Sequence, residues 1–361
     1  MRDETSHLPL SDLALIVEDN ETEVPSGYGA YLVSEAEISR YAGLENVYVR
    51  PEACTAGSFI EISGSHGSRA SLMGSSDIPD RTLFLTGLCN SNCIMCPYTE
   101  KYRQSSEEVS VETLSRFVDL MNPFSEYLCI TGGEPTLLMD GFLMLIKKVN
   151  EHFQDTLVHI LTNGRAFYYA DFLEGYKAVR PYRTLLGIPL HAGSAHLHDS
   201  ITQTVGSFYE TIRGIDNLYM AGEHIEIRIV TSAMNREALP ELALFIAKRY
   251  PQVYHVCFMG LEMMGNSMIN RNRVWCEYDE LWPYIQRATD VLIEHGIPVQ
   301  LYNYPLCVIE EKYHYIYKRS ITPSKVEYFE ACSLCQRIDD CGGFFRTTKI
   351  MPNIHVTPYL R

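Results

Sequence analysis

Short apolar runs alternate with segments of helical periodicity between about residue 82 and residue 300. In the segments between the runs, apolar residues recur at three- and four-residue spacing, as Phe142, Leu145, Ile146 and Val149 do, which predicts amphipathic helices. Strands and helices in regular succession are typical of βα units around a parallel sheet. Six such units predict an α/β fold, an open or partial (βα)6 barrel of the TIM type. The expected strands are 82–88, 126–131, 157–161, 184–190, 225–231 and 253–260.

The pattern changes on both sides of this region. Residues 1–80 hold short extended runs separated by Gly, Ser and Pro, which predicts a small β-rich domain, a candidate module for docking a peptide. Residues 81–300 are then the barrel. Residues 301–361 are rich in Tyr and Cys and show few clear elements, so we expect a small C-terminal domain organised by metal.

Composition narrows the classes of function. The chain has 361 residues, 46% of them hydrophobic, and 30 Lys and Arg against 45 Asp and Glu, a net charge of -15. This acidic balance disfavours nucleic acid as a partner, because phosphate binding needs an excess of basic residues. The first residues lack a basic segment followed by an apolar one, and no apolar run approaches bilayer length, which predicts a cytoplasmic protein without membrane spans. Several of the eleven cysteines are clustered, which favours metal over disulfides.

The first cysteine group follows the first predicted strand directly. Cys89, Cys93 and Cys96 have the spacing C-x3-C-x2-C. Three thiolates in one short loop can bind three corners of a 4Fe-4S cluster and leave the fourth iron open to another ligand. Zinc is an alternative, although it prefers four ligands and no histidine lies between His66 and His152 to complete the set. Ordinary core packing is the other alternative.

A second motif ends the second predicted strand, where Gly132, Gly133, Glu134 and Pro135 form GGEP. Glycines allow the backbone to approach a ligand closely, and a carboxylate beside them can hold an ammonium group. Together the cysteine loop and GGEP resemble the radical S-adenosylmethionine (radical SAM) superfamily. The resemblance implies a 4Fe-4S cluster on the three cysteines, SAM bound through its amino group at GGEP, and reductive cleavage of SAM to a 5'-deoxyadenosyl radical.

The same resemblance implies further SAM contacts. Met95 would pack near the adenine, and Thr162 and Asn163 would contact the nucleoside. Arg228 could bind the SAM carboxylate, or else form an internal ion pair. Glu262 is a weaker candidate of the same kind, and no catalytic acid or base is assigned.

The loop that contains His191, His196, His198 and Asp199 has the residue types of a metal site. We favour the interpretation that these residues form the loop after the fourth predicted strand. Asp199 would then fix the next turn, and the histidines would face the substrate cavity or solvent.

The second cysteine group lies near the end of the chain. Cys332, Cys335 and Cys341 have the spacing C-x2-C-x5-C, and Cys307 lies upstream as the least secure fourth ligand. Four thiolates complete a closed cage, which suits either structural zinc or an iron–sulfur cluster. The resemblance implies an auxiliary 4Fe-4S cluster in a shortened, twitch-type C-terminal domain.

Four features follow one another in the chain: CNSNCIMCPY, ITGGEPTL, an HD-containing loop before GSFYETIRGIDNL, and a terminal C-x2-C-x5-CGGFF. In this order residues 80–345 also resemble the His-Xaa-Ser system radical SAM maturases (HxsC). This narrower resemblance implies a peptide or small-protein substrate, possible cooperation with a companion radical SAM protein, and an electron donor such as flavodoxin or ferredoxin. Two alternatives stay open, namely a radical SAM enzyme acting on a small-molecule cofactor or nucleotide precursor, and a non-catalytic scaffold bound to metal.

Overall fold

The computed structural model describes residues 80–99, 101, 110–121, 123–321, 325–351 and 354–360, together with five short strands before residue 80. No helix in these ranges is both long and apolar enough to cross a membrane. The chain divides into two compact units. The first holds residues 1–90, 101–162 and 169–186, and the second holds residues 91–100, 163–168 and 187–361.

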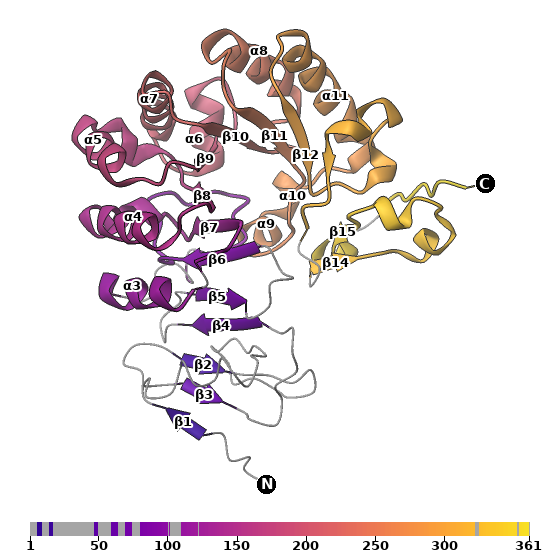
Figure 1. Ribbon diagram of the computed structural model, residues 1–361. Helices are drawn as coiled ribbons and strands as arrows, with labels where there is room; N and C mark the ends of the chain where they lie inside the picture. Colours follow the sequence, from indigo (N-terminus) through magenta and orange to yellow (C-terminus); the bar gives the residue numbers. More distant parts are fainter. Residues whose placement is uncertain are drawn as a thin grey trace. The chain divides into compact units, whose positions relative to one another are not determined.

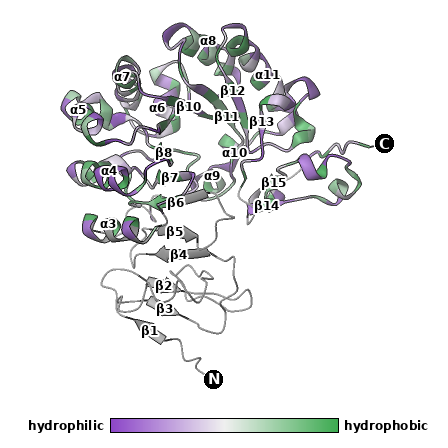
Figure 2. Cartoon of the chain, viewed as in Figure 1, coloured by the Kyte–Doolittle hydropathy of each residue, from purple (hydrophilic) through white to green (hydrophobic). Residues whose placement is uncertain are grey.

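The first unit is built on three parallel strands, in which Thr82 pairs with Cys129 and Cys129 with His159. Helices lie along one side of these strands (Figure 1). The side chains of Phe142, Leu145 and Val149 are fully buried, and each stabilises the unit by roughly 1.5–3 kcal/mol. Both hydrophobic and hydrophilic residues occur along these helices, as expected for helices with one buried face (Figure 2). The elements are β6 (Asp80–Phe84), α3 (Val111–Leu120), β7 (Tyr127–Thr131), η2 (Pro135–Leu138), α4 (Asp140–His152), β8 (Leu157–Leu161) and α5 (Ala170–Val179).

The five strands before β6 belong to the same sheet order, and β5 pairs antiparallel with β6 at Ala70 and Leu83. They are β1 (Ser6–Leu8), β2 (Ala14–Ile16), β3 (Val47–Val49), β4 (Phe59–Ser63) and β5 (Arg69–Met73). The remaining residues before 80, and with them the docking module expected there, lie outside the described residues.

The second unit continues the alternation of strand and helix. Strand β9 (Thr184–Pro189) begins in the first unit and ends in the second. The strands that follow are β10 (Ile225–Val230), β11 (His255–Met259), β12 (Val299–Tyr302) and β13 (Tyr317–Lys318), each parallel to its neighbour from β10 on. The helices are α6 (Ala195–Thr202), α7 (Ser207–Met220), α8 (Leu239–Arg249), α9 (Asn266–Ile269), α10 (Arg271–Val274) and α11 (Tyr278–Glu294).

Short elements make up the C-terminal part of this unit. They are the antiparallel pair β14 (Val326–Glu327) and β15 (Phe344–Phe345), and the 3-10 helices η5 (Leu306–Val308), η6 (Glu311–Ile316), η8 (Glu330–Leu334), η9 (Ile338–Asp340) and η10 (Arg346–Ile350). The second unit also holds η3 (Arg165–Tyr168) and η4 (Arg236–Ala238).

The α/β partial barrel predicted from the sequence is confirmed, and each of the six expected strands is present. The sheet is larger than six strands, because β12 and β13 follow in the order β6-β7-β8-β9-β10-β11-β12-β13, eight parallel strands in all. The sequence did not predict β12 and β13. Strands of four and two residues are too short to show an alternating pattern in the sequence. The domain boundaries at residues 80 and 300 stay predictions.

Candidate functional site

The GGEP motif lies against the backbone that leads into the first cysteine. Gly133 N donates to Thr86 O at 2.7 Å and Glu134 N donates to Leu88 O at 2.7 Å. These bonds continue the parallel pairing of β6 with β7 beyond the ends of both strands. The second bond fixes Leu88, the residue immediately before Cys89. The motif is therefore hydrogen-bonded directly to the start of the cysteine loop.

The two glycines are required by this close packing. A Cβ on Gly132 would lie 2.6 Å from Thr86 O, and a Cβ on Gly133 would lie 2.1 Å from Leu88 O. Both distances are shorter than any normal carbon–oxygen contact. The sequence predicted glycines for approach to a ligand, whereas the structure gives a different reason, the approach of one backbone segment to another.

Glu134 and Thr162, both predicted to be SAM contacts, are bonded to each other. The Glu134 side chain is 1% exposed, and its Oε1 accepts hydrogen bonds from Thr162 Oγ1 at 2.7 Å, Thr136 Oγ1 at 2.6 Å and Thr136 N at 3.0 Å. The carboxylate thereby caps η2, whose first residue is Pro135. These three donors fix the orientation of the buried carboxyl group. Its contact with SAM stays a prediction.

Cys89 belongs to the first unit, and Cys93 and Cys96 belong to the second. In the second unit, Asn92 N donates to Thr202 O at 3.0 Å and Ile94 N donates to Ile201 O at 2.8 Å, which attaches the loop to the end of α6. All three thiols are unbridged and half-buried. Thiols are the donor type that a 4Fe-4S cluster takes from a protein. Within the described ranges, no three His, Cys, Asp or Glu side chains are grouped as ligands of a single metal ion.

Met95 lies in an apolar cluster and is 7% exposed. Its contact with adenine stays a prediction, because the structure shows only its packing partners. The cluster also contains Ile94, Ile201, Leu261, Met263, Val274 and Met351.

Asn163 shapes the turn after β8, since its Oδ1 accepts a hydrogen bond from Arg165 N at 3.0 Å. The sequence analysis missed Arg165. Its Nε forms an ion pair with Glu210 Oε2 at 2.5 Å, and its Nη1 donates to Ser91 Oγ in the cysteine loop at 3.1 Å. The only sequence signal is its position directly after the Thr162–Gly164 segment.

Arg228 and Glu262 both form ion pairs within the second unit. Arg228 Nη1 binds Glu226 Oε1, and Glu226 Oε2 lies 2.7 Å from His255 Nε2. The structure thus shows the internal ion pair that was the alternative for Arg228. Glu262 lies 3.1 Å from Lys325 Nζ. Binding of SAM by either residue stays a prediction.

The histidine loop matches its prediction in part. Asp199 accepts hydrogen bonds from Gly206 N, Ser207 Oγ and Phe208 N at 2.7, 2.9 and 2.8 Å, and so fixes the turn before α7 as expected.

His196 is exposed, but His191 and His198 are 2% and 1% exposed, so the prediction that they face a cavity or solvent was wrong. Their rings stack with centroids 5.5 Å apart, and the His198 ring also packs on Phe208. Burial lowers the pKa of His191 to about 3, with a further effect of His198, and burial lowers the pKa of His198 to about 4.

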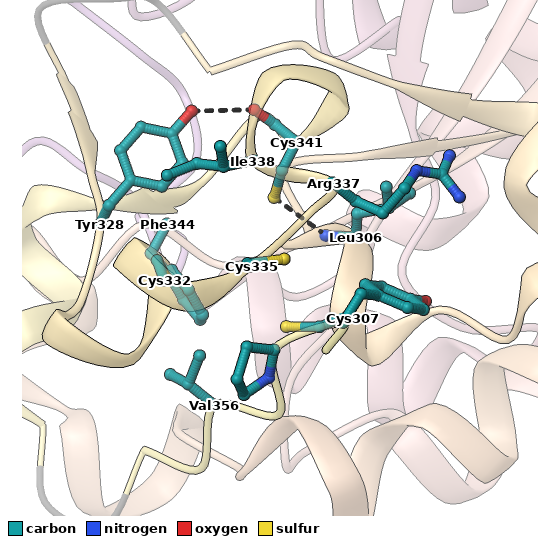
Figure 3. A pocket seen from close by; sticks show the side chains of 12 residues that line it. Leu306, Cys307, Tyr328, Cys332, Cys335, Arg337, Ile338, Cys341, Phe344 and Val356 are labelled. Carbon is teal, nitrogen blue, oxygen red and sulfur yellow. Dashed lines mark hydrogen bonds between the residues drawn. The ribbon is translucent and has the colours of Figure 1, made fainter. Parts of the chain in front are cut away.

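The four C-terminal cysteines share one pocket of about 320 Å³, its open mouth included. Cys307, Cys332, Cys335 and Cys341 line it together with Tyr328, Arg337 and Tyr359 (Figure 3). The least secure predicted ligand, Cys307, is therefore in the same pocket as the other three. Its ligation of a metal stays a prediction.

Backbone donors surround the sulfur of Cys341, which accepts hydrogen bonds from Leu306 N and Gly343 N, both at 3.3 Å. Burial raises the pKa of the Cys307 thiol to about 11, with a further effect of the negative charge of Cys341. Thiolates this close repel one another unless a cation lies between them. By its chemistry a set of four thiolates suits either a 4Fe-4S cluster or zinc, whereas the four sulfurs of the described structure are not grouped as ligands of a single metal ion.

Part of the chain is similar to known proteins. The sequence profile of the Radical SAM superfamily matches residues 83–246. The chain is 24% identical over 178 residues to the AdoMet-dependent heme synthase of Methanosarcina barkeri, which covers 48% of this chain and 49% of that protein. It is 27% identical over 186 residues to the antilisterial bacteriocin subtilosin biosynthesis protein AlbA of Bacillus subtilis, covering 50% of this chain and 40% of that protein. The chain thus spans about half or less of the length of these relatives.

Two solved structures match parts of the chain. Streptococcus suis SuiB bound to its precursor peptide SuiA matches with a TM-score of 0.49 and 13% identity, over 62% of this chain and 48% of that one. A radical SAM methyltransferase from Sphaerobacter thermophilus matches with a TM-score of 0.47 and 14% identity, over 75% and 82% of the two chains. Residues 83–246, which include the cysteine loop and GGEP, match the Radical SAM superfamily, and this match implies SAM and a 4Fe-4S cluster.

Proposed function

We propose that this chain is a radical SAM enzyme that modifies a residue in a peptide or small protein. The observation that carries the enzymatic part is the backbone pairing of Gly133 and Glu134 with Thr86 and Leu88. It places the motif expected to bind the SAM amino group beside the first of three cysteines expected to bind the cluster. Both lie at the carboxyl ends of parallel strands, where barrels of this kind position their chemistry.

The residues of the chain hold and orient the reactants. When bound, the cluster and SAM supply an electron and a 5'-deoxyadenosyl radical, which abstracts a hydrogen atom from the substrate. Glu134, fixed by Thr136 and Thr162, offers a buried negative charge at the SAM side of the motif. Arg165 fixes Ser91 in the cysteine loop. An electron donor such as flavodoxin or ferredoxin would reduce the cluster.

We further propose that the C-terminal pocket holds an auxiliary 4Fe-4S cluster on Cys307, Cys332, Cys335 and Cys341. The two backbone N–H donors to Cys341 support a thiolate at that position, because such bonds stabilise the charged sulfur of a ligand. Four protein ligands would leave no open iron, which suits electron transfer or support of the substrate rather than binding of SAM. Zinc in the same cage is the alternative.

A peptide substrate is supported by the resemblance to His-Xaa-Ser maturases and by the similarity to a bacteriocin biosynthesis protein. The similarity to a heme synthase favours a second candidate, a small-molecule substrate. An enzyme acting on a small molecule would turn over without any peptide, and residues 1–80 would be dispensable for recognition. A peptide enzyme would depend on its peptide and, in the system that it resembles, on a companion radical SAM protein.

Anaerobic purification followed by iron, sulfide and zinc analysis tests the two metal sites. About eight irons per chain are expected for two clusters, and about four irons with one zinc for the alternative.

Incubation with SAM and dithionite should yield 5'-deoxyadenosine, and mass analysis of a peptide encoded beside the gene should show a changed mass. Replacing Cys93 by Ala should abolish SAM cleavage, whereas a scaffold would keep its partner binding. Chains with full cluster content but no 5'-deoxyadenosine would contradict the enzymatic proposal.

A further inference from the structure

Helix α9 contacts the backbone of the two cysteines that lie in the second unit. Asn266 N donates to Cys96 O at 2.8 Å, and Asn266 Nδ2 donates to Cys93 O and to Asn92 Oδ1, both at 3.0 Å. One asparagine therefore makes three hydrogen bonds to a loop about 170 positions away in the sequence. Its side chain lies within the buried part of the unit at 8% exposure.

Neighbouring residues hold the same loop. Asn270 Nδ2 donates to Ile94 O at 3.3 Å, and Gly265, at a φ of +60°, packs so tightly that a Cβ would lie 2.1 Å from Pro97 O. On the other side, the carbonyl groups of Ile201 and Thr202 in α6 accept hydrogen bonds from two N–H groups of the loop. The loop is thus held between α6 and α9, with its carbonyls bound by one helix and its N–H groups by the other.

We propose that Asn266 is a positioning residue for the three-cysteine loop. Its effect on a cluster rests on the function proposed above, whereas its effect on the loop does not. A cluster imposes fixed distances between its ligand sulfurs, so a loop that is already held in one conformation loses less entropy on binding. Asn266 holds the carbonyls of both Cys93 and Cys96, which restricts the backbone on either side of Met95.

The test is Asn266→Asp, which keeps the size of the side chain but removes the amide donor. A carboxylate would then face Cys93 O and Asn92 Oδ1, two oxygens that repel it. Asn217→Asp is the matched control, since Asn217 Nδ2 also donates to backbone carbonyls, Phe167 O at 2.8 Å and Tyr168 O at 3.2 Å, and both acceptors lie outside the cysteine loop.

Two measurements are made on each full-length variant. Hydrogen exchange of a fragment covering residues 91–98 in the metal-free protein reads the loop itself, and we expect exchange at least ten-fold faster in Asn266→Asp. In reconstituted protein, the electron paramagnetic resonance spectrum of the reduced clusters should contain a signal that shifts when SAM is added. We expect the intensity of this SAM-responsive signal to be at least ten-fold lower in Asn266→Asp. The iron held at the C-terminal site and the behaviour of Asn217→Asp should stay as in the unmodified protein. If Asn266→Asp does not fold, Asn270→Ala, which removes one contact, should show a smaller change of the same kind.

Unchanged exchange and an unchanged SAM-responsive signal in a folded Asn266→Asp would overturn the proposal. So would equal losses in Asn266→Asp and Asn217→Asp, because they would indicate general destabilisation. Faster loop exchange in a chain whose unmodified form shows no SAM-responsive cluster would support the positioning role and refute the proposed function, so the two failures are distinguishable.

Discussion

Replacing Gly133 by Ala tests whether the GGEP glycines serve the packing of backbone against backbone. The new Cβ would lie 2.1 Å from Leu88 O and 2.5 Å from Gly87 O, whereas real Cβ contacts are essentially never under 3.0 Å. The two backbone segments would therefore have to separate by about 0.9 Å. A flexible side chain cannot absorb this movement, because both contacts are with backbone oxygens.

The separation acts on the hydrogen bonds that join the motif to the start of the cysteine loop. Gly133 N to Thr86 O and Glu134 N to Leu88 O are both 2.7 Å long, and a movement along them would stretch them to about 3.6 Å, beyond hydrogen-bond distance. Each lost bond costs about 0.5–1.5 kcal/mol, and overpacking costs about 1–3 kcal/mol. We expect a loss of about 2–6 kcal/mol in the free energy of unfolding, concentrated next to Cys89.

The assay combines urea unfolding with 5'-deoxyadenosine formation from SAM under anaerobic conditions. Gly133→Ala should lose both stability and SAM cleavage, because the cysteine loop is displaced. Gly193→Ala is the control, since its Cβ would lie at an ordinary 3.5 Å from Phe245. If Gly133→Ala kept normal stability and cluster content and raised only the KM for SAM, the glycine would serve approach to the ligand, and the packing argument would be refuted.

Three further predictions concern other parts of the molecule. Thr162→Val removes a donor to the buried Glu134 carboxylate, so we expect a loss of about 1.5–3 kcal/mol in urea unfolding; an unchanged midpoint would contradict that bond. Cys341→Ala should lower the iron bound per chain by about four while leaving SAM cleavage detectable, and loss of all iron would contradict two separate sites. His191 and His198 are neutral when folded, with pKa values of about 3 and about 4 against 6.5 in the unfolded chain, so below pH 6.5 only the unfolded state gains protons. Lowering the pH from 6.5 to 5 should therefore cost about 2 kcal/mol of stability per histidine, with no such effect above pH 7, and an unfolding midpoint constant over that interval would refute their burial as neutral groups.

Local features of the sequence predicted the fold and the motifs correctly. The helical spacing of Phe142, Leu145 and Val149 predicted α4, because burial of one face follows directly from that spacing. Spacing grouped Cys332, Cys335 and Cys341, and the structure places them in one pocket with Cys307, which the sequence offered only as a less secure upstream ligand. The strands β12 and β13 were missed because pairing with a neighbouring strand, β11 for β12 and β12 for β13, makes them strands rather than any pattern of their own.

The roles of individual site residues were harder to predict, because each depends on which group lies opposite. The sequence offered Arg228 both a ligand carboxylate and an internal ion pair, and the structure shows the ion pair with Glu226, two positions earlier on β10. The further partner of Glu226, His255, depends on the register of β10 and β11. A pattern along one strand contains no information on the strand beside it. The two buried histidines were misplaced for the same reason, since the packing of His198 against Phe208 depends on how α6 and α7 meet.

The residues that were missed altogether have the polar groups of the cysteine loop as partners. Asn266 binds the carbonyl of Cys93 across 173 positions, and Arg165 binds the hydroxyl of Ser91 across 74. A backbone carbonyl is the same in every residue. A hydrogen bond to it therefore requires no particular residue type or spacing that could be recognised as a sequence motif. A three-cysteine motif specifies which atoms can bind a cluster, whereas the groups that hold its backbone specify where those atoms lie. Substitutions at Asn266 should therefore alter cluster binding while every residue of the two recognisable motifs stays intact.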